Sequence, residues 1–137
     1  MVKYLLVSLL LFLPYSSKIN IDKKFEPYYN KVMEIVNEHC KPNQYYSLNE
    51  INFHEMEDTI LGTCYIFSEK IYINPRQWDR LSDDNKLQLF FHEMRHCLFW
   101  AGHSSDRNNY MYPELDEDRP IEVVKQQFID DLKKDCK

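Results

Sequence analysis

The sequence predicts an α+β domain in which three helices pack against one small, mixed and twisted sheet. Three long segments space their apolar residues as amphipathic helices do, and three short segments are rich in β-branched and aromatic residues, as strands are. The chain has 137 residues and neither an internal repeat nor a long linker, so we expect a single domain over residues 18–137.

The first helix is predicted over residues 25–39, because Pro27 suits a first helical turn and Val32 and Val36 follow helical spacing. All predicted strands lie between this helix and the next one. Their β-branched and aromatic content places three strands, the last of them ended by Pro75, at residues 51–53, 63–67 and 70–74.

The second helix is predicted to begin at Ser82, whose hydroxyl can cap it, and to run to about Phe99. Asp83 and Asp84 suit the positive end of its dipole. The third helix is predicted over residues 120–134, and the connection between the two is irregular. One apolar stripe marks this last helix: Ile121, Val124, Phe128, Ile129 and Leu132.

Residues 1–17 have the order of a secretory signal peptide, with Lys3, then an apolar run, then small residues. We place the cleavage site near Ser17, and an uncleaved membrane anchor is the alternative interpretation. The apolar run is too short for a stable membrane span. The predicted signal peptide leads us to expect a secreted or periplasmic protein.

The net charge of −5 argues against nucleic-acid binding, which needs a basic surface.

Four cysteines follow the predicted signal peptide, and an even number in a small exported domain favours disulfides. Four cysteines allow three pairings, and the sequence alone does not choose among them. We favour Cys64–Cys97 with Cys40–Cys136. Free buried thiols are the alternative, whereas a cysteine-ligated metal is not expected because no Cys-x-x-Cys occurs.

The second helix carries the motif His92-Glu93-Met94-Arg95-His96. At about 100° per residue, the two histidines lie within about 40° of each other, so both imidazoles can reach one ion. Glu93 lies beside them and can reach a water molecule at the metal without ligating it. The predicted helix has a polar front with the histidines and an apolar back formed by Leu87, Phe90, Phe91, Met94, Cys97 and Leu98.

A catalytic zinc site takes three protein ligands and keeps a fourth position open, and His103 is the candidate for the third ligand. It follows His96 by seven residues, so a continuous helix would carry it about two turns away. Gly102 is one of only two glycines in the chain. It is predicted to adopt a left-handed conformation that ends the helix and turns the chain back.

Residues 92–113 read HEMRHCLFWAGHSSDRNNYMYP and resemble the metzincin clan of zinc proteases, most closely the matrixins. Matrixins share HExxHxxGxxH followed by a methionine turn, and they commonly show HSSDPGALMYP from the third histidine onward. The resemblance implies that Met111 forms this turn as an apolar floor beneath the metal, without ligating it. Residues 71–78 (IYINPRQW) also resemble the matrixin strand that ends in a tryptophan.

One departure from the clan lies between the second and third histidines, which are seven residues apart here and six in the clan. Phe99 stands where the clan has glycine. We interpret this as one extra residue in the turn, with Gly102 replacing the clan glycine.

The resemblance implies a zinc-dependent endopeptidase with one Zn²⁺ held by His92, His96 and His103. Glu93 would act as general base toward water at the metal and then pass the proton to the leaving amine. The edge strand near Leu61 to Phe67 would bind an extended peptide or protein substrate by strand addition. We expect the chain to be a monomer.

Three other functions stay open at this point: a zinc-binding module without turnover, a zinc amidase acting on a non-protein substrate, and a disulfide-stabilised structural domain. We assign no metal role to His54, and we interpret the acidic residues 114–118 as a solvated loop and not a calcium site. Tyr110 and Tyr112 are alternatives for an oxyanion donor, but we expect them to be packing residues.

Overall fold

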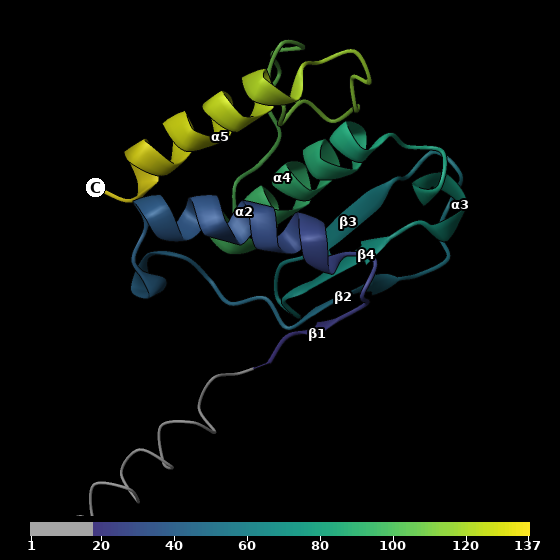
Figure 1. Ribbon diagram of the computed structural model, residues 1–137, viewed down its shortest axis with the longest axis horizontal. Coiled ribbons are helices and arrows are strands. Elements are labelled where there is room, and N and C mark those ends of the chain that lie inside the picture. The colour runs from purple at the N-terminus through teal and green to yellow at the C-terminus, as the bar shows by residue number, and fades with distance from the viewer. Residues whose placement is uncertain (1–17) are drawn as a thin grey trace, which may run out of the picture.

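Four strands form one mixed sheet in the computed structural model, which describes residues 18–137. The sheet order is β1-β2-β4-β3, and Figure 1 shows the strands below and behind the helices. Strands β1, β2 and β4 are parallel to one another, whereas β3 runs antiparallel to β4 at one edge. The bounds are Asn20–Ile21 for β1, Glu50–Phe53 for β2, Gly62–Tyr65 for β3 and Lys70–Ile73 for β4.

The sheet has one buried face and one partly exposed face. Ile51 and Ile71 are register partners on β2 and β4, and both are buried with Ile73 in the core. The next side chain along β4 points the other way, as the period of a strand requires. There Tyr72 stacks with His54 at a ring separation of 4.8 Å.

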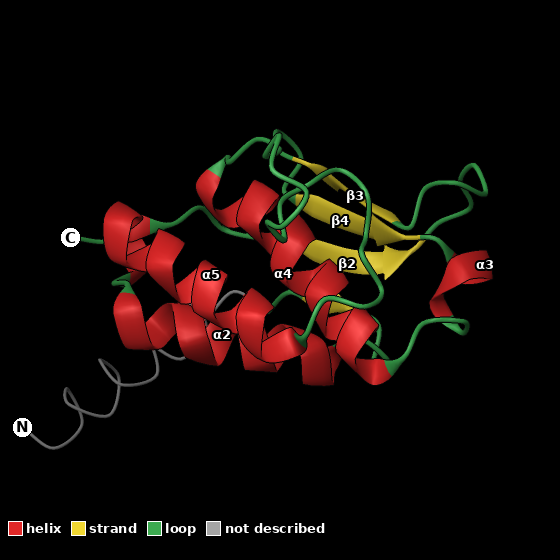
Figure 2. Cartoon of the chain, turned by 90° about the horizontal axis from the view of Figure 1, so that it is seen from above, coloured by secondary structure: helices red, strands yellow, loops and turns green. Residues whose placement is uncertain are grey.

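Three helices lie on the side of the sheet's buried face, as the two views agree (Figures 1 and 2). They are α2 (Glu26–His39), α4 (Asp83–Phe99) and α5 (Ile121–Asp135). Helix α4 lies between the layers and contacts β3, β4, α2 and α5. Its central place explains why 11 of its 17 residues are buried. The predicted α+β class and the three long helices are therefore confirmed.

Short elements and strand ends were less predictable than the helices. The sequence did not predict β1, a 3-10 turn at Pro42–Gln44, or the short helix α3 at Pro75–Trp78. Strand β3 ends at Tyr65, and Glu69 turns the chain into β4 with a left-handed φ of 57°. The predicted strand over 63–67 is therefore too long at its end, because its last residues form this turn.

Asn74 corrects the prediction that the third strand runs through it to Pro75. Its side-chain oxygen accepts from the Arg76 N–H and caps α3. Its amide donates to the carbonyls of Glu57 and Ile60, at 3.1 and 2.8 Å. Trp78 consequently ends a short helix and not a strand, and it packs edge-on against Phe25.

Two disulfides join distant segments, and both pairings favoured from the sequence are confirmed. Cys40–Cys136 connects the end of α2 to the residue after α5, and Cys64–Cys97 connects β3 to α4. Both bonds fit an oxidising compartment. Among residues 18–137, no helix has the length and apolar character needed to cross a membrane. The predicted signal peptide lies outside the described residues.

Removing Cys40–Cys136 should cost more stability than removing Cys64–Cys97. The first bond spans 96 residues and the second 33, and loop-closure entropy predicts losses of about 4.7 and about 3.7 kcal/mol. Urea denaturation of the two double Cys→Ala variants under non-reducing conditions measures both losses. A larger loss for the Cys64–Cys97 variant would contradict this prediction.

Candidate metal centre

Three histidines bring their Nε2 atoms together beside the C-terminal half of helix α4. His96 Nε2 lies 3.2 Å from His92 Nε2 and 3.2 Å from His103 Nε2. The ligand atoms of all three residues lie within 4.8 Å of one another, so the group could hold a metal ion. His92 is buried, His96 is partly buried and His103 is exposed, which leaves one side of the group open to solvent.

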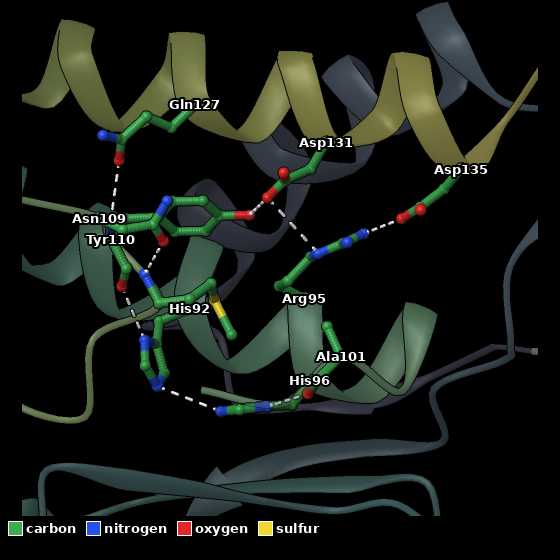
Figure 3. Close-up of polar contacts among 10 residues, drawn as sticks. His92, Arg95, His96, Ala101, Asn109, Tyr110, Gln127, Asp131 and Asp135 are labelled. Carbon is green, nitrogen blue, oxygen red and sulfur yellow. Dashed lines mark hydrogen bonds and ion pairs between the residues drawn. The ribbon is translucent and has the colours of Figure 1, made fainter. Parts of the chain in front are cut away.

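Backbone carbonyls set the tautomers of the two helical histidines. His92 Nδ1 lies 2.8 Å from the Tyr110 carbonyl oxygen, and His96 Nδ1 lies 2.6 Å from the Ala101 carbonyl oxygen (Figure 3). A carbonyl oxygen can only accept, so each Nδ1 carries the proton and each Nε2 presents a lone pair. Such hydrogen bonds orient the imidazoles of metal sites.

Burial keeps these imidazoles neutral, which is the form that binds metals. Desolvation lowers the pKa of His92 to about 4, and the hydrogen bond to Tyr110 opposes that shift only in part. Desolvation also lowers the pKa of His96. Without a cation, the lone pairs of His92 and His96 would face each other at 3.2 Å with no proton between them. The donor set therefore fits a cation at this position.

The turn after α4 differs from its prediction. Trp100, not Gly102, takes the left-handed conformation, with φ of 55°, and its N–H bonds to the His96 carbonyl. Gly102 has no positive φ, and no heavy atom lies within 4 Å of where its Cβ would be. Trp100 stacks on Tyr46 at 4.5 Å, a contact that helps to offset the strain of a large residue in this conformation.

A loop whose end is buried joins the third histidine to the core. The Ser104 N–H donates to the Met111 carbonyl at 2.9 Å, which closes the loop that follows His103. The Asn109 side chain accepts from the Met111 N–H at 2.8 Å, so the chain turns tightly here. Tyr110 and Met111 are both buried in the core. The tight turn predicted at Met111 is present, whereas a role of its side chain beneath a metal stays a prediction.

Glu93 lies beside the histidines, with one carboxylate oxygen 3.9 Å from His92 Nε2. Burial raises its pKa to about 8, and a hydrogen bond with the Cys64 backbone opposes the shift. Gly62 of β3 lies next to this side chain: a Cβ there would meet Glu93 Cγ at an ordinary contact distance of 3.6 Å, and it would lie closer to Ile73 Cδ1, at 3.1 Å. A cation held by the histidines would favour the carboxylate form of Glu93.

Within the polar front predicted for α4, His92 and Glu93 are buried. Strand β3 and the loop that contains Tyr110 cover them on two sides. What remains open is a cavity of about 580 Å³ that reaches His92, Glu93 and His103. Apolar and aromatic side chains form much of its remaining wall: Ile60, Leu61, Leu89, Tyr112, Pro113 and Leu115.

Several contacts of the site could not be predicted from the residue types in the sequence. The carbonyls of Tyr110 and Ala101 act through the backbone, where residue type says little. Arg119 is buried and donates to the Gln88 side chain and to the Arg107 carbonyl, each at 2.6 Å, which ties the loop to α4. Tyr110 packs in the core as expected, and its hydroxyl donates to Asp131 at 2.8 Å.

Comparison with known proteins adds no relative to this picture. The chain matches no model of a known protein family, and no curated protein or solved structure matches it at the significance required.

The exposed side chain of His103 should be essential for metal affinity. His103→Ala is expected to weaken Co²⁺ binding by at least about 100-fold, because two imidazoles would remain where three converge. Titration followed by the visible absorbance of bound Co²⁺ measures the dissociation constant. The matched control is His54→Ala, since His54 stacks on Tyr72 outside the group. Unchanged affinity in His103→Ala would remove His103 from the ligand set.

Gly102→Ala should be tolerated, although the sequence suggested that a glycine was needed here. With no positive φ and open space at its Cβ, alanine should raise the free energy of unfolding by about 0.4–1 kcal/mol through its stiffer unfolded chain. Gly62→Ala is the contrasting variant and should lose stability, because its Cβ would approach Ile73 and the backbone of Tyr72. Equal losses in urea denaturation would contradict the assignment of the turn to Trp100.

Proposed function

We propose that the chain is a zinc-dependent endopeptidase of the matrixin-like type. The observation that carries the proposal is the placement of one buried carboxylate, Glu93, beside three converging Nε2 atoms at an open cavity. Three neutral nitrogen ligands with a free fourth position are typical of catalytic zinc and differ from closed structural sites. The sequence resemblance at residues 92–113 supports the same chemistry.

The spacing of the ligand atoms supports zinc as the metal. A tetrahedral zinc ion with Zn–N bonds of about 2.0–2.1 Å needs its nitrogens about 3.3–3.4 Å apart. Two of the Nε2 pairs are 3.2 Å apart. Imidazole ligands suit zinc better than they suit calcium or magnesium, which prefer oxygen.

Glu93 is the residue to which we assign proton transfer. A zinc ion held by the three histidines would acidify a water molecule and polarise the carbonyl of the substrate. Glu93 takes the proton from the attacking water and later gives it to the leaving amine. The burial that raises the pKa of Glu93 brings it nearer to neutral pH, where a group can both accept and donate. Strand β3 covers Glu93 and limits the access of bulk water.

The edge strand beside the cavity supports a peptide as the substrate. Strand β3 pairs only with β4 among the described strands, so its outer edge is free to accept an extended peptide. Exposed apolar side chains flank β3 along the chain and beside the turn that follows it, and Phe67 of that turn is 93% exposed. They are Ile60, Tyr65 and Phe67 from the β3 segment and Tyr46 and Trp100 beside it. Such an apolar border suits the side chains of a peptide better than a small polar substrate.

Glu93→Gln should abolish most peptide cleavage while zinc stays bound. We expect kcat/KM to fall by about 10²–10⁴-fold, because the amide cannot accept the proton from water. Zinc content per chain and cleavage of a mixed peptide library measure both properties, and sequencing the products shows the side chains preferred around the cut. Glu117→Gln is the control, since Glu117 also lines the cavity but is exposed.

Two outcomes would contradict the proposal. A zinc-loaded wild-type chain that cleaves no peptide would favour a zinc-binding module without turnover. Full activity in Glu93→Gln would show that another group is the base.

A further inference from the structure

Helix α5 carries a polar stripe that the proposed mechanism does not use. Gln127, Asp131 and Asp135 are four residues apart, so they lie along one side of the helix. The stripe runs next to the buried residues Val124, Phe128 and Leu132. Figure 3 shows all three polar side chains pointing toward α4 and the loop of Tyr110. Their contacts connect α5 to Arg95 of α4 and to Tyr110, whose carbonyl bonds to His92.

The Gln127 amide holds two backbone groups of this loop. Its oxygen accepts from the Tyr110 N–H at 2.9 Å, and its nitrogen donates to the Asn108 carbonyl at 2.8 Å. The loop there has no helix or strand to satisfy these groups. One side chain therefore supplies the donor and the acceptor that a neighbouring strand would supply in a sheet. The bonds fix the peptide planes on both sides of Asn109.

Tyr110 is held at its other end by the same helix. Its hydroxyl donates to Asp131 at 2.8 Å, and its ring packs edge-on against Phe128 with centroids 6.1 Å apart. Arg95 of α4 approaches the same Asp131 carboxylate at 3.7 Å and forms an ion pair with Asp135. Arg95 lies between the two helical histidines in the sequence. Helix α5 therefore contacts α4 through Arg95 and contacts the loop through Tyr110.

We propose that Gln127 is a positioning residue for the metal centre. It fixes the Asn109–Tyr110 peptide, and the next peptide along the chain carries the Tyr110 carbonyl that lies 2.8 Å from His92 Nδ1. That bond selects the tautomer of His92 and aims its Nε2 at the shared position. The inference rests on the metal site in the proposed function and not on peptide cleavage. Loss of a partner that bonds a ligand directly weakens metal affinity by about 10–100-fold, and Gln127 acts one hydrogen bond further out, so its loss is expected at the lower end of that range.

The test compares Gln127→Met with Gln126→Met. Methionine keeps the length of the side chain and removes both hydrogen bonds, whereas Gln126 is exposed and its side chain donates to Asp130 on the same helix. We expect the zinc dissociation constant of Gln127→Met, measured by competition with a chromophoric chelator, to rise at least about tenfold. We also expect the absorbance bands of bound Co²⁺ to shift, because the aim of His92 changes. Gln126→Met should match the wild type in both.

Tyr110→Phe gives a second test that leaves the carbonyl in place and removes only the hydroxyl bond to Asp131. We expect a smaller rise in the zinc dissociation constant, of several-fold. Wild-type zinc affinity and Co²⁺ bands in both folded variants would overturn the inference while leaving the peptidase proposal standing. So would a loss of metal-free thermal stability in Gln127→Met with unchanged Co²⁺ bands, since that marks a purely structural role. A wild-type chain that binds neither ion would overturn the metal centre and this inference together.

Discussion

The burial of helix α4 is the constraint on which the rest of the structure depends. The helix contacts the sheet and both other long helices, and its buried residues include the polar side chains of Gln88, His92 and Glu93. A buried polar group without a partner costs about 1–3 kcal/mol. Every element that covers α4 must therefore satisfy these groups as well as exclude water.

The covering elements meet this need in different ways. Strand β3 approaches Glu93 through Gly62 and is joined to α4 by Cys64–Cys97. The loop after His103 gives its Tyr110 carbonyl to His92 and is itself tied to α5. Buried Arg119 donates to the side chain of Gln88 and so satisfies that buried polar group. The hydrogen bonds to the buried polar groups of α4 thus fix the loops that surround the histidines. The site is therefore held as rigidly as the core.

This arrangement divides the centre into a buried half and an exposed half. His92 and Glu93 lie in the core, where desolvation keeps the imidazole neutral and raises the pKa of the carboxyl group. His103 comes from an exposed turn and closes the group on the side of the solvent. A rigid buried half with one open side suits a centre that must keep its geometry and still admit a ligand.

Much of the fold and the identity of the clustered residues could be predicted from the sequence. Apolar periodicity located the three long helices, and the four-residue spacing of His92 and His96 placed them on one face, because both follow from the local geometry of a helix. Only the tertiary structure decided that Trp100 and not Gly102 makes the turn, and that the carbonyls of Tyr110 and Ala101 orient the histidines. Every residue has a carbonyl, so its partner depends on how distant segments pack. The sequence by itself determined which side chains could bind a metal, and packing around α4 decided how they are buried, oriented and held.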